Sequence, residues 1–131
     1  MIDLKEGDEI AIVSGTLYSV EHFPSLKQKH KPKVVDKHGL SDEPIKVIKV
    51  TSKTIQIEKR DSSGYQRIGR EEFGRLVKHP YMYGIKRVYT LNEPEYIEKA
   101  VELVEKAIED SRVQCIEILE KSLSNLKEWD D

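Results

Sequence analysis

The sequence has very little cysteine and contains no long apolar run. Its 131 residues include one cysteine, Cys115, which excludes an internal disulfide and leaves a cysteine-based zinc site without enough ligands. No segment approaches the roughly 18 consecutive apolar residues of a membrane-spanning helix, and the first residues form no apolar signal segment. We therefore expect a protein of a reducing cytoplasm that does not contact a membrane.

Hydrophobic residues are also scarce. They make up 37% of the chain, whereas charged residues make up 35%, against about 25% in a typical globular protein. The net charge of −2 hides an uneven distribution: residues 1–26 carry one basic and five acidic side chains (−4), residues 27–90 carry sixteen and seven (+9), and residues 91–131 carry five and twelve (−7). Either the middle segment presents a basic face, or the three segments neutralise one another within the fold or across a dimer.

Short apolar segments and turn residues alternate in the first part of the chain. Residues 10–13 (IAIV) are typical of a strand, and residues 14–16 (SGT) are typical of a tight turn that leads into a second strand at 16–23. The segment 24–44 is charged and interrupted by proline, so we expect it to be an exposed loop.

The β-branched residues that follow predict further short strands with turns between them. These strands are expected at residues 45–50, 54–58, 65–68 and 84–91. The apolar alternation slips between Val47 and Ile48, which indicates a bulge or a two-faced strand, and residues 61–64 (DSSG) predict a hairpin turn. The expected fold class is α+β, with residues 1–91 forming a small antiparallel SH3-like barrel or a strongly bent sheet.

At Asn92 the pattern changes to that of a helix. Asn92 can cap a helix, Glu95 completes a capping box, and neither glycine nor proline occurs from residue 95 to residue 131. A helix over residues 92–129 would be about 55 Å long, whereas a compact domain of this size is roughly 36 Å across. The helix therefore either pairs with a second copy as a coiled coil or folds back near residues 110–112, and the absence of turn residues there favours pairing.

We therefore expect residues 92–131 to be the dimerisation segment of a homodimer. Apolar residues recur along this segment at steps of three and four, as they do along one face of a helix. The predicted dimer seam consists of Val104, Ile108, Cys115, Leu119, Leu123 and Leu126.

The chain offers no arrangement of side chains that is typical of an enzyme. His22, His30 and His38 recur every eight residues, a spacing that suits neither one strand nor one helix face, so we interpret them as surface histidines rather than metal ligands. Cys115 lies on the apolar helix stripe and is expected to be a core residue rather than a nucleophile. We therefore expect a protein without catalysis, metal or cofactor.

Basic and aromatic residues are interleaved in the middle of the chain. Residues 69–75 (GREEFGR) are either corners of the barrel or a loop that presents two guanidinium groups to phosphate or carboxylate. Small barrels bind single-stranded nucleic acid by stacking bases on aromatic rings while lysine and arginine hold the phosphates. We therefore predict that nucleic acid, or else a protein partner, is contacted by Lys27, Lys29, Lys31, Lys33, Arg67, Arg70, Arg75, Tyr81, Tyr83, Lys86 and Arg87.

Several short motifs resemble those of a recurring type of small bacteriophage protein. They are residues 6–13 (EGDEIAIV), 48–55 (IKVTSKTI), 67–68 (RI) and 74–77 (GRLV). Proteins of this type open with a Gly-Asp strand, continue with a Lys- and Thr-rich hairpin and close with an acidic helix. The first strand is also similar to SH3-like barrels of the KOW type. The segment 24–44 and the long helix depart from this pattern.

The resemblance implies action in the cytoplasm of a bacterial host, in host takeover or in evasion of host defence. It adds a second hypothesis, in which the chain is a phage inhibitor that binds a host protein or sequesters a nucleotide signal between subunits. A structural role in a virion is a third. The resemblance assigns no functional residues, so none is transferred from it.

Overall fold

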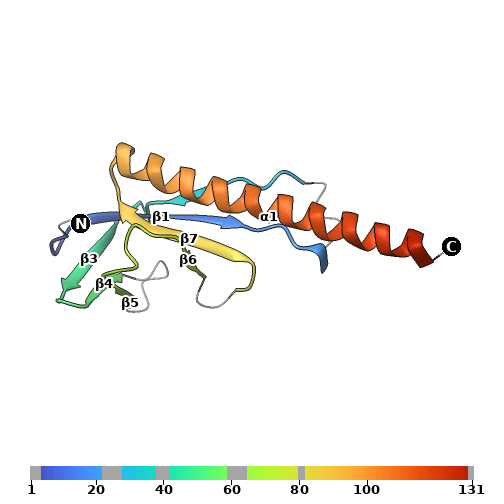
Figure 1. Cartoon of the computed structure of the whole chain (residues 1–131). Helices are drawn as coiled ribbons and strands as arrows, with labels where there is room; N and C mark the ends of the chain where they lie inside the picture. Colours follow the sequence, from blue (N-terminus) through green and yellow to red (C-terminus); the bar gives the residue numbers. More distant parts are fainter. Residues whose placement is uncertain (1–3, 22–27, 38–41, 59–64, 80–81, 130–131) are drawn as a thin grey trace.

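The computed structural model describes residues 4–21, 28–37, 42–58, 65–79 and 82–129 (Figure 1). It confirms an α+β protein in which a curled antiparallel sheet is followed by one long C-terminal helix. In chain order the elements are β1 (Glu9–Thr16), β2 (Lys33–Val35), β3 (Ile45–Val50), β4 (Thr54–Glu58), β5 (Tyr65–Gly69), β6 (Val77–Lys78), β7 (Ile85–Leu91) and α1 (Pro94–Trp129). Within the described ranges, no helix combines the length and the apolar character needed to cross a bilayer.

The sheet follows the strand order β5-β4-β3-β1-β7-β6, and β2 joins it beside β1. Strand β1 pairs with β3 at Glu9 and Ile10 and with β2 at residues 12–14, so β2 takes the place at which β3 leaves β1. The register between β3 and β4 shifts between Val47 and Lys49, which confirms the predicted irregularity in this strand.

Three local features differ from what the sequence predicts. Strand β1 runs straight through residues 14–16, and residues 17–21 form no strand, so the predicted tight turn and the predicted strand at 16–23 are wrong. The sequence predicts an exposed loop throughout residues 24–44. This prediction is wrong for the three residues of β2, which pair with β1. The hairpin turn predicted at residues 61–64 lies outside the described residues.

Gly15 serves a close approach of the helix rather than a turn. A Cβ atom on Gly15 would lie 2.5 Å from Cγ1 of Val104 and 2.8 Å from Cδ1 of Ile108, well inside van der Waals contact. Only glycine lets the backbone of β1 come this near to α1. The glycine that suggested a turn is therefore explained by a residue 89 positions further along the chain.

Alternation along β1 divides the apolar residues between two cores. Ile10 and Ile12 face the inside of the curl, whereas Val13 faces α1. The first core also holds Leu4, Ile45, Val47, Ile55, Ile57, Ile68 and Tyr89. The second core also holds Tyr18, Val88, Ala100, Val104, Ile108 and Cys115. A hydrogen bond of 2.9 Å from Nε2 of Gln66 to the hydroxyl of Tyr89 joins β5, at one end of the sheet, to β7 across the curl.

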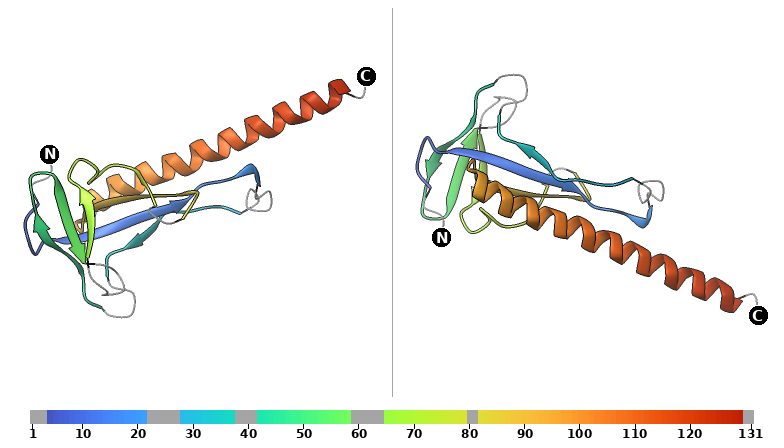
Figure 2. Two further views of the ribbon diagram at one scale, coloured as in Figure 1. Left: turned by 90° about the horizontal axis from the view of Figure 1, so that it is seen from below. Right: turned by 90° about the horizontal axis from the view of Figure 1, so that it is seen from above.

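Helix α1 is continuous, so the alternative of a hairpin near residues 110–112 is excluded. Its 36 residues span about 54 Å, and its C-terminal part projects beyond the sheet, as the two views of Figure 2 show. The sheet covers only the first part of one helix face. The remainder of that face has no neighbour in the described chain.

The structure changes the predicted dimer seam. Val104 and Cys115 are buried against the chain's own sheet, so the prediction that they contact a second copy is wrong. Ile108 is also buried there, and it reaches the surface only at the wall of a groove described below. The other predicted seam residues, Leu119, Leu123 and Leu126, follow the last buried helix residue, and the last two are 53% and 61% exposed.

Candidate functional site

Strand register aligns basic side chains in two neighbouring rows near one end of the sheet. In the first row Lys33 of β2 pairs with Ser14 of β1, which pairs with Arg87 of β7. In the next row Lys86 of β7 pairs with Lys78 of β6. Neighbouring strands are about 4.8 Å apart, so the three steps from β2 to β6 cover roughly 14 Å. We call the four cations Lys33, Lys78, Lys86 and Arg87 the basic band.

The basic band reaches both faces of the sheet. Directly paired residues on antiparallel strands point to the same face, so Lys33 and Arg87 share the inner face of the curl, while Lys78 and Lys86 share the face that carries α1. Like charges that lie directly opposite each other, as these two lysines do, destabilise a sheet. Among the described residues, no carboxylate forms an ion pair with any member of the band. The charge of the band is therefore open to an anionic ligand.

Arg87 is held in place by its neighbour Tyr89. Its Nη1 donates a hydrogen bond of 2.8 Å to the Tyr89 hydroxyl, and the guanidinium carbon lies 5.6 Å from the centroid of the Tyr89 ring. Its Nε is buried and has no hydrogen-bond partner among the residues that the structure describes. A buried donor without a partner costs about 1–3 kcal/mol, so this position of Arg87 is destabilising for the fold. The contacts with Tyr89 nevertheless hold Arg87, one cation of the basic band, in a defined position.

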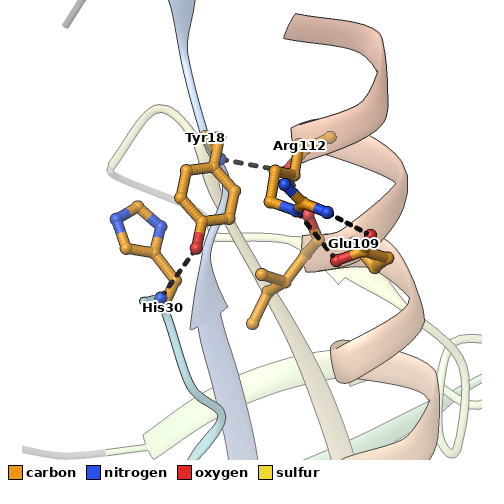
Figure 3. Close-up of polar contacts among 6 residues, drawn as sticks. Tyr18, His30, Glu109 and Arg112 are labelled. Atoms are coloured by element: carbon orange, nitrogen blue, oxygen red, sulfur yellow. Dashed lines mark hydrogen bonds and ion pairs between the residues drawn. The ribbon is translucent and has the colours of Figure 1, made fainter. Parts of the chain in front are cut away.

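The segment before β2 extends the basic surface along the helix. Lys29 and Lys31 are exposed, whereas His30 between them is partly buried and stacks on Tyr18 with ring centroids 4.1 Å apart (Figure 3). The His30 backbone N–H donates to the Tyr18 hydroxyl over 3.0 Å. Nδ1 of His30 donates to the carbonyl of Thr16 over 2.8 Å, which places a proton on that nitrogen. His30 is therefore an anchoring residue and not a chance surface histidine.

Ser111 connects this anchored segment to α1. The backbone N–H of Tyr18 donates to the Ser111 hydroxyl over 3.0 Å, and that hydroxyl donates to the carbonyl of Ile108 over 2.6 Å. One helix turn thereby fixes the direction in which the chain leaves β1 (Figure 3). The ion pair between Arg112 and Glu109, at 3.2 Å, lies beside it, and the hydrogen bonds that the Arg112 guanidinium donates to that carboxylate raise the pKa of Arg112.

We expect Ser111→Ala to lower the free energy of unfolding by about 1–2 kcal/mol, because the Tyr18 N–H loses its acceptor in a partly buried place. Urea unfolding followed by circular dichroism measures this change. Ser122→Ala is the matched control, since Ser122 is exposed on the same helix and should change stability by less than about 0.5 kcal/mol. Equal effects of the two substitutions would show that the link between Ser111 and Tyr18 contributes nothing.

A hollow of about 460 Å³ lies beside the basic band, and its lining includes Lys78, Lys86, His79 and Tyr83. Burial, and then the positive charge of Arg87, lower the pKa of His79 from its ordinary value. Nδ1 of His79 accepts the backbone N–H of Met82 over 3.1 Å, which requires the neutral ring. Tyr83 is fully exposed at the rim of this hollow and offers a ring to a ligand.

The structure does not gather the eleven predicted contact residues on one surface. Lys27 and Tyr81 lie outside the described residues. Arg67 is exposed on β5, away from the basic band, and Arg75 is exposed before β6. Arg70 lies in the corner formed by residues 69–75. The other six, Lys29, Lys31, Lys33, Tyr83, Lys86 and Arg87, lie in the basic band or beside it.

Residues 69–75 form a corner of the fold. Nη1 of Arg70 donates to the carbonyl of Thr51 over 3.4 Å, and Gly74 has a φ of 81°, which suits a turn. Of the two alternatives for this segment, the structure therefore supports the corner. Lys78 belongs to the basic band but was not predicted, because a strand of two residues is too short to show an alternating pattern.

Other features of the described chain do not indicate a different kind of site. In the ranges that the structure covers, no three His, Cys, Asp or Glu side chains converge as they would to hold a metal ion. Comparison of the chain with protein-family models, with curated proteins and with solved structures found no match. The geometry of the basic band and its surroundings is therefore the feature of the described chain that indicates a function.

Proposed function

We propose that this chain is a non-catalytic binding protein that contacts single-stranded nucleic acid through the basic band. The observation that carries the proposal is the strand register, which brings into two adjacent rows four cations that have no carboxylate partner in the described part of the chain. Phosphate contacts by lysine and arginine supply most of the affinity in sequence-independent binding.

The arrangement of the band favours a single strand over a duplex. Its two pairs of cations point to opposite faces of the sheet, so a rigid duplex can lie against only one pair. A flexible single strand can bend around the end of the sheet and reach both. Tyr83 beside Lys78 and Lys86 supplies an exposed ring of the kind on which bases stack. Lys29 and Lys31 continue the positive surface along the preceding segment.

The test is a pair of charge-matched triple variants. Lys33, Lys78 and Lys86 are replaced by glutamine in the first, and Lys46, Lys49 and Lys53 in the second. The control lysines are exposed on β3 and the turn after it, away from the band, so both variants lose three positive charges from the surface. Binding of a fluorescein-labelled single-stranded oligonucleotide is followed by anisotropy between about 50 and 200 mM salt.

We expect the first triple variant to bind about tenfold more weakly or worse at the low-salt end. Its plot of log affinity against log salt should be shallower by about 2, since each lost phosphate contact on a single strand contributes about 0.7 to the slope. The control variant should keep most of the affinity and slope. Absence of binding by the unmodified protein at low salt, or equal losses in both variants, would refute the proposal.

A second candidate function is inhibition of a bacterial host protein by a phage-type protein acting in the host cytoplasm. The observation that favours it is the pair of adjacent exposed side chains Met82 and Tyr83, which suits an anchor in a protein interface. The acidic surface of α1 can mimic nucleic acid in such a complex. Capture of a host protein from bacterial lysate that survives nuclease treatment, and is lost on Tyr83→Ser, would favour this candidate over nucleic-acid binding.

A further inference from the structure

One face of α1 changes character along its length. Its first half borders a groove of about 830 Å³ that lies between the helix and the segment 28–32. The helix residues that line this groove include Val101, Glu105, Ile108 and Arg112, and the opposite wall includes His30 and Pro32. In the second half, which we call the overhang (residues 116–129), the sheet has ended and apolar side chains are exposed.

The groove and the overhang belong to the same helix face. Residues that differ by three or four positions lie on one side of a helix. Four helix residues that line the groove and four apolar residues of the overhang form a single series with these steps: Val101, Glu105, Ile108, Arg112, Ile116, Leu119, Leu123 and Leu126. We call this series the α1 stripe. Ile118, which is 53% exposed, lies on another side of the overhang. The first half of the α1 stripe lines the groove, and its second half ends in leucines that have no neighbour in the described chain.

We propose that the α1 stripe pairs with the same stripe of a second copy in antiparallel orientation, so that the overhang of each copy lies in the groove of the other. A two-fold axis requires that when residue i contacts residue j of the partner, j also contacts i. The α1 stripe meets this condition along its whole length. Every pair taken inward from its two ends sums to 227 or 228, in the order 101 with 126, 105 with 123, 108 with 119, and 112 with 116.

This register places the leucines of one copy's overhang against the groove of the other copy. Leu126 of the partner lies at Val101, and Leu119 of the partner lies at Ile108, which are the apolar residues of the groove wall. With both sheets on the same side of the helix pair, the overhang lies over the segment 28–32, where Pro32 and His30 form the other wall. The exposed leucines of each copy are thereby covered by the other copy's groove, and they fill space that the chain itself leaves empty.

Charges beside the stripe agree with this register. Lys127 follows Leu126 at the end of the overhang and comes opposite positions 100 and 101 of the partner. Glu98, Glu102 and Glu105 surround that point on the same side of the helix, and all three are exposed. An antiparallel pair therefore brings a lysine to an acidic cluster at each of its ends. A parallel pair would align each glutamate with its own copy.

The size of the contact explains why the groove is needed. From residue 101 to residue 126 the stripe is about 38 Å long, and a helix is about 10 Å wide, which gives a footprint of about 400 Å² per copy. A stable interface buries about 800 Å² per partner, so two helices alone provide roughly half of what is required. The wall formed by residues 28–32 supplies further contact area. The partner surface is therefore the whole groove and not only the helix.

The first test compares two substitutions that exchange an exposed apolar residue for an acid. Leu123→Glu lies on the α1 stripe, whereas Val113→Glu lies on another side of the same helix and is similarly exposed. Light scattering of the unmodified protein and of Val113→Glu at micromolar concentration should give twice the chain mass of 15.2 kDa. Leu123→Glu should give the mass of one chain with an unchanged circular dichroism spectrum. A monomeric unmodified protein overturns the proposal, as does a dimer that Leu123→Glu leaves intact.

The second test determines the register. A double variant with Val101→Cys and Leu126→Cys should form an inter-chain disulfide on mild oxidation, because each new cysteine faces its counterpart on the partner. The same two positions are too far apart on one helix to bridge within a chain. Neither single variant should cross-link. Cross-linking by Leu126→Cys alone would indicate parallel pairing and overturn the proposed register.

Dimerisation and nucleic-acid binding fail independently in these experiments. Leu123→Glu keeps all four cations of the basic band, so as a monomer it should still bind the labelled oligonucleotide. The triple variant of the band keeps the α1 stripe and should still scatter light as a dimer. Each proposal is therefore tested by a readout that the other does not affect.

Discussion

Gly15→Ala should lower the free energy of unfolding by about 2–3 kcal/mol, the largest effect expected from adding one methyl group to this protein. The added Cβ meets Cγ1 of Val104 at 2.5 Å and Cδ1 of Ile108 at 2.8 Å. Helix α1 must therefore move away from β1, and the core between them loses contact. Urea unfolding measures the change. Gly69→Ala is the control, since its Cβ would meet only the Glu72 side chain at an ordinary 3.5 Å.

Val104→Ala in the Gly15→Ala background makes the physical cause of that loss testable. Alone, Val104→Ala leaves a cavity and should destabilise the protein. Combined with Gly15→Ala, it removes the atom closest to the new methyl group, so the double variant should be more stable than the sum of the two single effects predicts by at least about 1 kcal/mol. Additive effects would show that the helix does not rest on Gly15 in solution.

Tyr89→Phe should destabilise the protein by about 2–3 kcal/mol although it removes a single oxygen. The Tyr89 hydroxyl accepts hydrogen bonds from Nε2 of Gln66 and from Nη1 of Arg87, and both donors lose their partner. Hydrogen bonds to a charged group contribute about 1.5–3 kcal/mol, and leaving the donors unpaired in a partly buried place adds to the loss. The link between β5 and β7 that closes the curl is lost as well.

Thermal or urea unfolding of Tyr89→Phe gives this value directly. Tyr83→Phe removes the same atom from a fully exposed ring and should change stability by less than about 0.5 kcal/mol. A Tyr89→Phe variant as stable as the Tyr83→Phe control would mean that the curl does not depend on this hydroxyl. Tyr89→Phe should also bind nucleic acid more weakly, because Arg87 loses the hydroxyl group that orients it.

The parts of the fold that the sequence predicts correctly are those with local causes. The β3–β4 hairpin follows from alternating residues around a short turn, and α1 follows from an uninterrupted apolar repeat after Asn92. The bulge beside Val47 is visible as a slip in that alternation. In each case the residues that determine the structure are neighbours in the chain, so a pattern within a few residues is sufficient.

The parts that the sequence predicts wrongly depend on distant residues. Ser14, Gly15 and Thr16 are typical turn residues, and only the helix 89 positions later explains why the strand continues through them. The apolar repeat of α1 predicts a buried face but not what covers it, so Val104 was expected in a seam and is found against the chain's own sheet. In both cases the deciding contact lies outside any local pattern.

The candidate site could be predicted only in its composition. The excess of positive charge between residues 27 and 90 is plain in the sequence, and it predicts Lys33, Lys86 and Arg87 as contact residues. Their alignment depends on the register of four strands, which pairs Lys33 with Ser14 and Ser14 with Arg87 across a separation of 73 residues. No feature of the separate segments specifies that register.

The pairing of β1 with β7 has a consequence for the order in which the protein is made. Ile10 pairs with Leu91 and Thr16 with Ile85, so the central strand meets its longest partner only after residues 17–84 have been synthesised. Contacts between such distant segments form slowly, and both faces of β1 are apolar. While the nascent chain grows, β1 is a hydrophobic segment that nothing yet covers, and it is a natural place for a chaperone to bind. The strand at the centre of the finished protein therefore leaves the ribosome well before β7 and α1, the two elements that bury it.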